Sequence, residues 1–491
     1  TPEWTREHRY GNKTAMVSTE GRLFYVDNQV HPSIEDLPDR PFLVARNAFN
    51  GVLLWKKPIY PRTPKDLMKP GRDSSEFTHF EPKFPLELKV VAIKDRLYTA
   101  FGEHGEIQVL DAATGKLKGT FEGTEHTEEI LYADGVLLTV VPEKKDELKE
   151  MNYTTAELNY VTFTRKRANI LRAIDPETGD ILWEDNTGKG GGLKVSPVIK
   201  DGDIYTVVGD RLVRLDLFTG NLGWQKALPD DMEKEQLQSV KYIKGPSVYD
   251  RLIAGDEVIL LIYNSGGGST DTFIRAFSQK TGKQLWSYEG ISPHRAGIEA
   301  FIIEDKIWVH KKSEYQQESG YDWQNKPLVA LDIKTGKELQ HLDQEKIYNV
   351  GHHHRCYGNR ATSRFLLTAR RGTEFTNFKS GEIDLHHWVR GKCRFGVLPC
   401  NGLLYSLPHA CSCYPYTMFK GYSALAPEGA SDVSKKAFNS DENRLVRGPN
   451  YGEIKDSDSS DGSETSASWP TYRHDARRSG STPNSVNPEN L

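Results

Sequence analysis

Ala173-Ile-Asp-Pro-Glu-Thr-Gly-Asp-Ile-Leu-Trp183 is the fullest copy of a phrase that recurs along the chain. The phrase has an Asp or Asn, then Thr-Gly or a close variant, then Trp four residues after the glycine. Shorter copies keep a glycine in register at positions 51, 115, 220, 282, 336 and 381. Neighbouring glycines of this series are 41 to 64 residues apart, a period that suits propeller blades of four strands with loop insertions.

The phrase predicts a hairpin turn between two strands, because Asp side chains accept hydrogen bonds from nearby amides and glycine adopts positive φ. The Trp then falls on the following strand, where its ring can pack against the next blade. A second hairpin phrase, such as Ile199-Lys-Asp-Gly-Asp-Ile-Tyr205, precedes most copies. We therefore expect four strands per unit, with these indoles buried between blades: Trp55, Trp183, Trp224 and Trp286.

An eighth unit without the Thr-Gly phrase runs from Cys393 through Asn401-Gly402 to Leu425. The sequence therefore predicts an all-β protein, an eight-bladed β-propeller with four-stranded antiparallel blades over residues 1–425. A pair of non-repetitive β-sandwiches is the alternative. The repeats resemble those of the PQQ-type (pyrroloquinoline-quinone) β-propeller, which quinoprotein dehydrogenases share with an outer-membrane assembly lipoprotein. The resemblance implies the fold and leaves the function open, since one fold hosts many functions.

The remainder of the chain divides into two parts. Residues 426–468 are rich in Ser and Asp, which predicts a surface linker. Residues 469–491 begin with Trp469-Pro-Thr-Tyr-Arg-His-Asp-Ala-Arg-Arg-Ser-Gly480, which is similar to the phrase that opens the first blade of many such propellers. This C-terminal segment is expected either to close the ring against the N-terminal blade or to begin a second propeller.

The charge balance narrows the class of partner. The chain has 64 Lys and Arg against 68 Asp and Glu, a net charge of −4, and this argues against a nucleic-acid binder. No apolar run is long enough to span a membrane. We expect a secreted or periplasmic protein that binds an acidic polysaccharide or a protein partner.

All five cysteines lie between Cys356 and Cys413. By blade register, Cys356 and Cys393 fall near the start of the innermost strand in adjacent blades, and the turn with Cys411 and Cys413 returns to the same face. Cys400 falls at the opposite end of its strand. These four cysteines, without Cys400, predict a tetrahedral zinc site, in which His409 or one of His352–His354 can replace a thiolate. The alternative is two disulfides that join Cys411 and Cys413 to Cys356 and Cys393.

The surrounding sequence supplies candidate catalytic groups. The run from His352-His-His-Arg-Cys-Tyr357 through His386-His-Trp-Val-Arg390 to His409-Ala-Cys-Ser-Cys413 broadly resembles that of propeller polysaccharide lyases, such as those acting on ulvan, which hold a structural zinc beside a His/Tyr/Arg site. β-Elimination from a uronate needs a neutralised carboxylate, a base and an acid. Arg360 or Arg390 could pair with the carboxylate. His353 or His354 could be the base, and Tyr357 or His387 the acid. Each of these residues could instead be an ordinary polar group of the channel lining.

Two other functions remain open. A quinoprotein dehydrogenase, with PQQ as its cofactor, often has a vicinal Cys-Cys disulfide or a Cys-x-x-Cys-His haem motif, and the sequence has neither, so it disfavours this reading. A non-catalytic scaffold of the assembly-lipoprotein type is the main alternative to the lyase.

Overall fold

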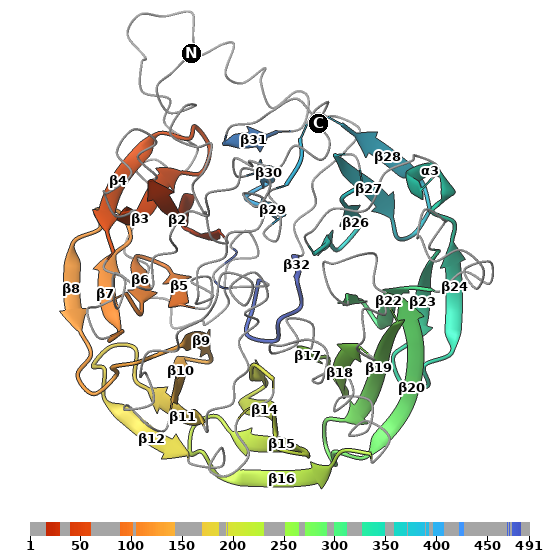
Figure 1. The fold of residues 1–491 in the computed structure, drawn as a ribbon, viewed down its shortest axis with the longest axis horizontal. Helices are drawn as coiled ribbons and strands as arrows, with labels where there is room; N and C mark the ends of the chain where they lie inside the picture. The colour runs from red at the N-terminus through yellow and green to blue at the C-terminus, as the bar shows by residue number, and fades with distance from the viewer. Residues whose placement is uncertain are drawn as a thin grey trace, which may run out of the picture.

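The computed structural model describes nineteen stretches of the chain, and the account below concerns only these: residues 16–29, 40–59, 89–101, 105–142, 169–185, 193, 195–229, 251–264, 271–291, 299–311, 327–348, 358–370, 372–387, 389–391, 396–406, 422–426, 469, 471 and 474–482. The described residues form eight antiparallel sheets arranged as a closed ring (Figure 1). The prediction of an eight-bladed β-propeller is confirmed.

The blades follow one another in chain order, and within each blade the strands run in sequence from the centre of the ring outwards (Figure 1). Blades 1 to 4 consist of β1 (Val17–Thr19), β2 (Arg22–Gln29), β3 (Arg40–Asn47) and β4 (Leu53–Pro58); β5 (Val90–Ile93), β6 (Arg96–Thr99), β7 (Gln108–Asp111) and β8 (Leu117–Thr120); β9 (Glu129–Ala133), β10 (Val136–Pro142), β11 (Asn169–Ile174) and β12 (Ile181–Asp185); β13 (Val198–Lys200), β14 (Asp203–Val208), β15 (Arg211–Asp216) and β16 (Leu222–Ala227).

The second half of the ring contains two departures from the four-stranded pattern. Blades 5 to 8 consist of β17 (Arg251–Ala254), β18 (Val258–Asn264), β19 (Asp271–Ser278) and β20 (Gln284–Ile291); β21 (Ala300–Ile303), β22 (Lys306–His310), β23 (Leu328–Asp332) and β24 (Glu338–Leu342); β25 (Arg360–Thr362), β26 (Phe365–Thr368), β27 (Thr373–Asn377) and β28 (Ile383–His386); β29 (Val397–Cys400), β30 (Leu403–Ser406) and β31 (Ser423–Leu425). Blade 8 thus has three strands among the described residues. Blade 7 gains a fifth strand, β32 (Ser481–Thr482), which pairs in parallel with β25.

The described residues include one α-helix, α3 (Glu345–Tyr348), and no helix among them is long and apolar enough to cross a membrane.

The turns form as the sequence predicts. All seven glycines of the repeated phrase have positive φ, between 68° and 82° for those from Gly51 to Gly381. In blade 4, Asp216 Oδ1 accepts hydrogen bonds from the amide of Thr219 (2.8 Å) and from its hydroxyl (2.7 Å). The Asp201-Gly202 hairpin has positive φ at both central residues, the conformation that matches the twist of paired strands.

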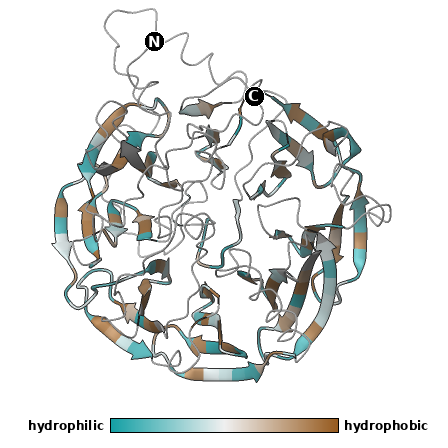
Figure 2. Cartoon of the chain, in the orientation of Figure 1, coloured by the Kyte–Doolittle hydropathy of each residue, from teal (hydrophilic) through white to brown (hydrophobic). Residues whose placement is uncertain are grey.

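The core lies between the blades. Buried apolar residues collect into clusters at the junctions of neighbouring sheets, because each blade presents one face to the blade before it and the other to the blade after it. Brown hydrophobic segments accordingly recur in every blade around the ring (Figure 2). The cluster that joins blade 8 to blade 1 contains Cys400, Tyr405, Tyr25 and Trp469, so the ring is closed by side-chain packing.

The four repeat tryptophans do lie between blades, but they are less buried than the sequence predicts. Trp286 is 8% exposed, whereas Trp55, Trp183 and Trp224 are only partly buried. The reason is that each ring sits on an outermost strand, with one face on the next blade and one edge at the circumference of the ring. Its indole nitrogen donates to a backbone carbonyl of that next blade, as in the 2.8 Å bond from Trp183 Nε1 to Leu217 O.

Candidate functional site on the connection rim

The two rims of the ring differ in what they carry. The turn rim has the short hairpins that join the first strand of each blade to the second and the third to the fourth. On the opposite rim, which we call the connection rim, the innermost strands begin and the second strands end. The long connections between described strands, such as residues 143–168 and 230–250, therefore start and end on the connection rim. The described residues of the predicted site, Arg360, His387 and Arg390, lie at this rim.

Most of the predicted site lies outside the described residues. This applies to three candidate catalytic groups, His353, His354 and Tyr357, and to four candidate zinc ligands, Cys356, Cys393, Cys411 and Cys413. The proposed substitutes for a thiolate, His352–His354 and His409, are outside them as well. Within the stretches that the structure does describe, no group of three or more His, Cys, Asp or Glu residues could hold a metal ion. The zinc site and its disulfide alternative both stay predictions.

Cys400 is described, and it is a buried free thiol at the turn end of β29. Burial raises the pKa of this thiol to about 12, so it stays protonated at neutral pH. Asn401 Nδ2 lies 3.5 Å from its sulfur and 3.0 Å from Ser18 Oγ of blade 1. Its environment is thus the packed junction between the last blade and the first.

Arg360 is the first residue of β25 and is 8% exposed. Its Nη1 donates to the carbonyl oxygens of Gly358 (3.3 Å) and Asn359 (3.0 Å), and this fixes the guanidinium against its own backbone. The buried Glu299 of blade 6 lies against the same loop, since a Cβ at Gly358 would be 2.6 Å from Glu299 Oε1. A buried carboxylate and a buried guanidinium therefore flank Gly358 where blades 6 and 7 meet.

Glu374 organises the connection between β26 and β27. This buried carboxylate accepts hydrogen bonds from the amides of Arg370 (2.8 Å) and Gly372 (3.2 Å) and from the hydroxyl of Thr368 (3.2 Å). The tight connection packs on the end of β28, because a Cβ at Gly372 would lie 2.1 Å from the carbonyl oxygen of His386. His387, the next residue, is half-buried beside it.

Arg390 precedes blade 8 and is 1% exposed. Its carbonyl oxygen accepts a 2.8 Å bond from Ser406 Oγ of blade 8, and the neighbouring Val389 carbonyl accepts a 3.2 Å bond from Thr373 Oγ1 of blade 7. The structure therefore brings Arg360, His387 and Arg390 to one sector of the connection rim. It buries the two arginines rather than opening them to solvent.

The sequence predicts that the C-terminal segment either closes the ring against the N-terminal blade or begins a second propeller, and it does not predict the contacts that this segment makes with other blades. Ser18 of β1 and Trp469 exchange two backbone hydrogen bonds, of 2.8 and 3.1 Å. The carbonyl oxygen of Ala476 accepts from the Ile199 amide of β13 (2.9 Å), and β32 then pairs with β25. Figure 1 shows β32 in the middle of the ring. The segment thus contacts innermost strands on several sides of the ring.

Charged side chains anchor this segment. Arg478 forms an ion pair with Glu129 of blade 3, and both side chains are buried. Glu129 also accepts a 3.1 Å hydrogen bond from Ser196 Oγ of blade 4. Burial alone would raise the pKa of Asp475, but the hydrogen bond and charge of His474, together with Arg477, outweigh it and hold that pKa at about 2. Asp475 is therefore ionised at neutral pH.

Part of the repeat region matches a known family of protein sequences. Residues 166–346, from the end of blade 3 through blade 6, match the family model PQQ_2, described as outer membrane protein assembly factor BamB. These are PQQ-like propeller repeats. No curated protein sequence matches the chain.

Three solved structures illustrate what this chain is similar to in fold. BamB from Moraxella catarrhalis has 11% identity and a TM-score of 0.43, with 81% of this chain and 93% of that chain covered. A quinohemoprotein alcohol dehydrogenase from Comamonas testosteroni has 12% identity and a TM-score of 0.45, with 82% and 73% covered. Kuenenia stuttgartiensis hydrazine synthase has 11% identity and a TM-score of 0.40, with 72% and 99% covered. At such identities the likeness concerns the fold alone.

Proposed function

We propose that this PQQ-like propeller is a non-catalytic binding protein that holds a protein partner on its connection rim. The observation that carries the proposal is the C-terminal segment at the centre of the ring, hydrogen-bonded to innermost strands of blades 1, 4 and 7. Because the chain's own backbone occupies the axis, the surface left for a partner is the rim around it.

The family description fits this class of function. The matching family model is named for an assembly factor of outer membrane proteins, which makes a protein the natural class of partner. A secreted or periplasmic location follows from the same likeness and is part of the proposal.

The described residues give less support to cleavage of an acidic polysaccharide. A lyase needs an arginine that reaches the uronate carboxylate, and Arg360 and Arg390 are 8% and 1% exposed. Incubation of the purified protein with uronate-containing polysaccharides tests this directly. We expect no rise in the ultraviolet absorbance of the unsaturated product, and sustained turnover would overturn the non-catalytic proposal.

Site-specific photo-crosslinking in the native cell tests where a partner binds. A photoreactive amino acid at Glu122 or Lys311, on the connection rim, should capture one and the same protein. Matched positions on the turn rim are Phe218 and Lys334, both exposed, and they should not capture it. Equal capture from both rims, or none from the connection rim, would overturn the assignment of the surface.

A further inference from the structure

The innermost strands of five blades begin at or directly after a charged residue. These positions lie at the inner edge of the connection rim, because the innermost strands start there. The sign of the charge alternates around the ring, from blade 2 through blades 3, 5 and 6 to blade 7. In that order the residues are Lys89, Glu129, Arg251, Glu299 and Arg360.

Four of these residues are buried and have partners within the chain. Glu129 pairs with Arg478, and Arg360 donates to two carbonyl oxygens of its own loop. Lys89 and Glu299 are 5% and 4% exposed, and both take part in further interactions. These four residues therefore belong to the folded framework of the rim.

Arg251, the first residue of β17, is the exception. Its side chain is half-buried, and its Nη1 is shielded from solvent without a hydrogen-bond acceptor. In the part of the chain that the structure describes, its guanidinium forms no ion pair. A guanidinium is always charged and carries five donors, so leaving it unpaired and partly desolvated costs free energy. Arg251 thus adds a charge to the rim without adding a polar contact to the fold.

The equivalent positions of the neighbouring blades do not supply the missing acceptor. Ser196, which precedes the innermost strand of blade 4, donates its hydroxyl to Glu129 of blade 3 (3.1 Å). Glu299 of blade 6 lies toward blade 7, where a Cβ on Gly358 would be 2.6 Å from its Oε1. Both side chains are therefore engaged with blades other than blade 5.

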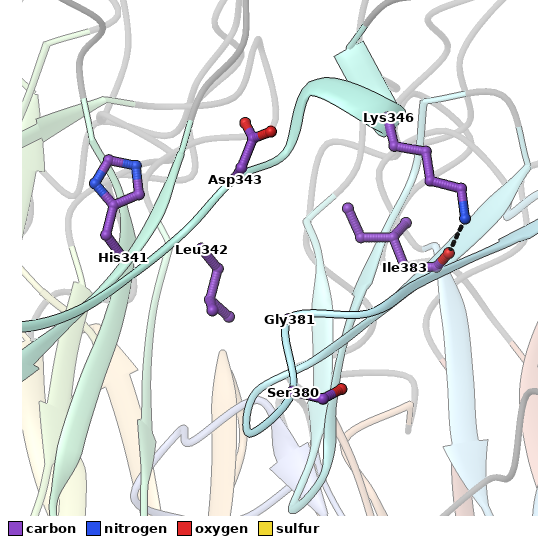
Figure 3. A pocket seen from close by; sticks show the side chains of 7 residues that line it. All are labelled: His341, Leu342, Asp343, Lys346, Ser380, Gly381 and Ile383. Atoms are coloured by element: carbon purple, nitrogen blue, oxygen red, sulfur yellow. Dashed lines mark hydrogen bonds between the residues drawn. The ribbon is translucent and has the colours of Figure 1, made fainter.

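Charged groups at the groove between blades 6 and 7 are engaged as well. Asp343 Oδ1 accepts a hydrogen bond from the amide of Glu345 (3.1 Å), and Lys346 Nζ donates to the carbonyl oxygen of Ile383 (Figure 3). The groove has a volume of about 400 Å³ and is lined by His341, Leu342, Asp343, Lys346, Ser380, Gly381 and Ile383. These charges serve the local fold, whereas that of Arg251 does not.

We propose that Arg251 anchors a carboxylate of the protein partner, so that an acidic segment of that partner docks on blade 5 at the inner edge of the connection rim. The inference rests on the function proposed above and names the chemistry of the partner. A carboxylate fits because it can accept two parallel hydrogen bonds from a guanidinium, and partial desolvation strengthens such an ion pair. A doubly charged phosphate fits less well, since the charged residues on either side of Arg251 in the ring order, Glu129 and Glu299, are both acidic.

Urea denaturation of Arg251→Met separates a binding role from a structural one. Methionine keeps much of the aliphatic stem and removes the unpaired charge, so the midpoint of unfolding should stay the same or rise. Arg360→Met is the matched comparison, because it removes two hydrogen bonds to carbonyl oxygens and should lower the midpoint. A fall in Arg251→Met as large as that in Arg360→Met would overturn the inference and leave the proposed function untouched.

Photo-crosslinking from Lys311, the rim position chosen above, measures what Arg251 contributes to partner binding. Arg251→Met should reduce the yield of the captured protein at least about tenfold. Arg251→Lys should reduce it less, because the charge remains and only the planar fork is lost. Arg211→Met is the control, since Arg211 is exposed on the same rim with its Nε 3.8 Å from Asp210, and it should leave the yield unchanged.

The two ways in which this experiment can fail are distinguishable. Undiminished capture in a folded Arg251→Met protein would overturn the inference alone. Absence of capture from the wild type would overturn the proposed function and the inference with it.

Competition in an extract of the same cells tests the chemistry of the partner. At equal ionic strength, a tetraglutamate peptide should reduce the capture from Lys311, and a tetraglutamine peptide should not. Equal competition by the two peptides, or stronger competition by inorganic phosphate than by tetraglutamate, would overturn the carboxylate assignment.

Discussion

The turn glycine and the tryptophan four residues after it serve two different junctions. Gly220 has a φ of 72°, which its own turn requires, and it also receives the ring of Trp183 from the blade before. A Cβ at this position would be strained and would lie 2.8 Å from the indole. The repeat therefore encodes the turn within one blade and the contact between two blades in a single phrase.

Truncating such a ring should be costly even though one edge is exposed. We expect Trp183→Ala to lower the free energy of unfolding by about 3 kcal/mol, the low end for loss of a large aromatic side chain. Trp183→Phe keeps most of the ring and loses the hydrogen bond to Leu217 O, so it should cost only about 1 kcal/mol. Urea denaturation measures both values, and equal losses in the two variants would contradict the packing argument.

The turn aspartates make the stability of the folded protein depend on pH in the acid range. Hydrogen bonds from Thr114, Thr219 and Thr335 lower the pKa of the aspartates that accept them, Asp111, Asp216 and Asp332. The folded carboxylate thus binds a proton less readily than the unfolded one. Its contribution is fully present above the unfolded pKa near 3.8 and is lost as the pH falls through the lower folded pKa.

Replacing the three aspartates by asparagine should remove this dependence. Blades 1 and 7 already use Asn47 and Asn377 for the same turn, with the amide oxygen accepting the backbone hydrogen bonds. We expect the triple variant to resemble the wild type at pH 7 and to lose less stability between pH 5 and pH 3. Thermal melts across this range measure it, and parallel curves for the two proteins would contradict the prediction.

The sequence predicts these residues well because the signals are local. Asp216, Thr219 and Gly220 lie within five positions, so their hydrogen bonds can be inferred without knowing the rest of the fold. The partial exposure of Trp183 could not be inferred, since it depends on how far the next blade covers the ring.

Among the structural elements, the C-terminal segment depends most on one buried ion pair. Arg478→Met leaves Glu129 charged in the channel, and we expect it to cost about 3–5 kcal/mol. Adding Glu129→Gln should recover much of this loss, because the remaining amide can still accept the hydrogen bond from Ser196. Chemical denaturation of the single and double variants measures the coupling. Additive losses would show that the pair is not the anchor.

The cysteine connections can be examined by counting thiols. If the four clustered cysteines bind zinc, the unfolded, chelator-treated protein should show five free thiols and release one zinc per chain. If they form two disulfides, only the thiol of Cys400 should react. Thiol titration without reductant, together with elemental analysis, separates the two. A count of three thiols would contradict both.

Elements joined by short turns are predictable, and elements joined across the ring are not. The Asp201-Gly202 hairpin brings together strands that are neighbours in sequence. The pairing of β32 with β25 joins distant parts of the chain through a two-residue strand. The pairing of Trp469 with Ser18 does so through two hydrogen bonds. The similarity of Trp469–Gly480 to the opening phrase of such propellers allows closure against the N-terminal blade, but it does not specify the pairings with blades 4 and 7. The placement of Arg360 and Arg390 on one rim follows from blade register, but their burial does not.

At the scale of the whole molecule, the ring is closed by contacts equivalent to those elsewhere. Tyr405 of blade 8 donates a 2.8 Å hydrogen bond to Ala48 O of blade 1, and Tyr98 of blade 2 donates a 3.2 Å bond to Pro176 O of blade 3. Both tyrosines are buried. The junction of the two ends of the propeller therefore resembles an internal junction.

We accordingly expect Tyr405→Phe and Tyr98→Phe to lower the free energy of unfolding by a similar amount, about 1 kcal/mol each. Unfolding should remain a single transition in both variants when followed by tryptophan fluorescence and by circular dichroism. An additional early transition in Tyr405→Phe alone would show that the ring opens first between blades 8 and 1.

The axial position of the C-terminal segment also governs when the protein can finish folding during its synthesis. At 5–20 residues per second a ribosome needs on the order of a minute to pass from Ser18 to Trp469. Ser18 is synthesised at the start of this interval and Trp469 at its end. Until Arg478 has been synthesised, Glu129 has no arginine to form its ion pair with. During this interval the innermost strands lack the partners that the C-terminal segment supplies to Glu129 and to the backbone amides of Ser18 and Ile199. Assembly at the axis is consequently a late step of folding, because Trp469 is synthesised long after the strand that it pairs with.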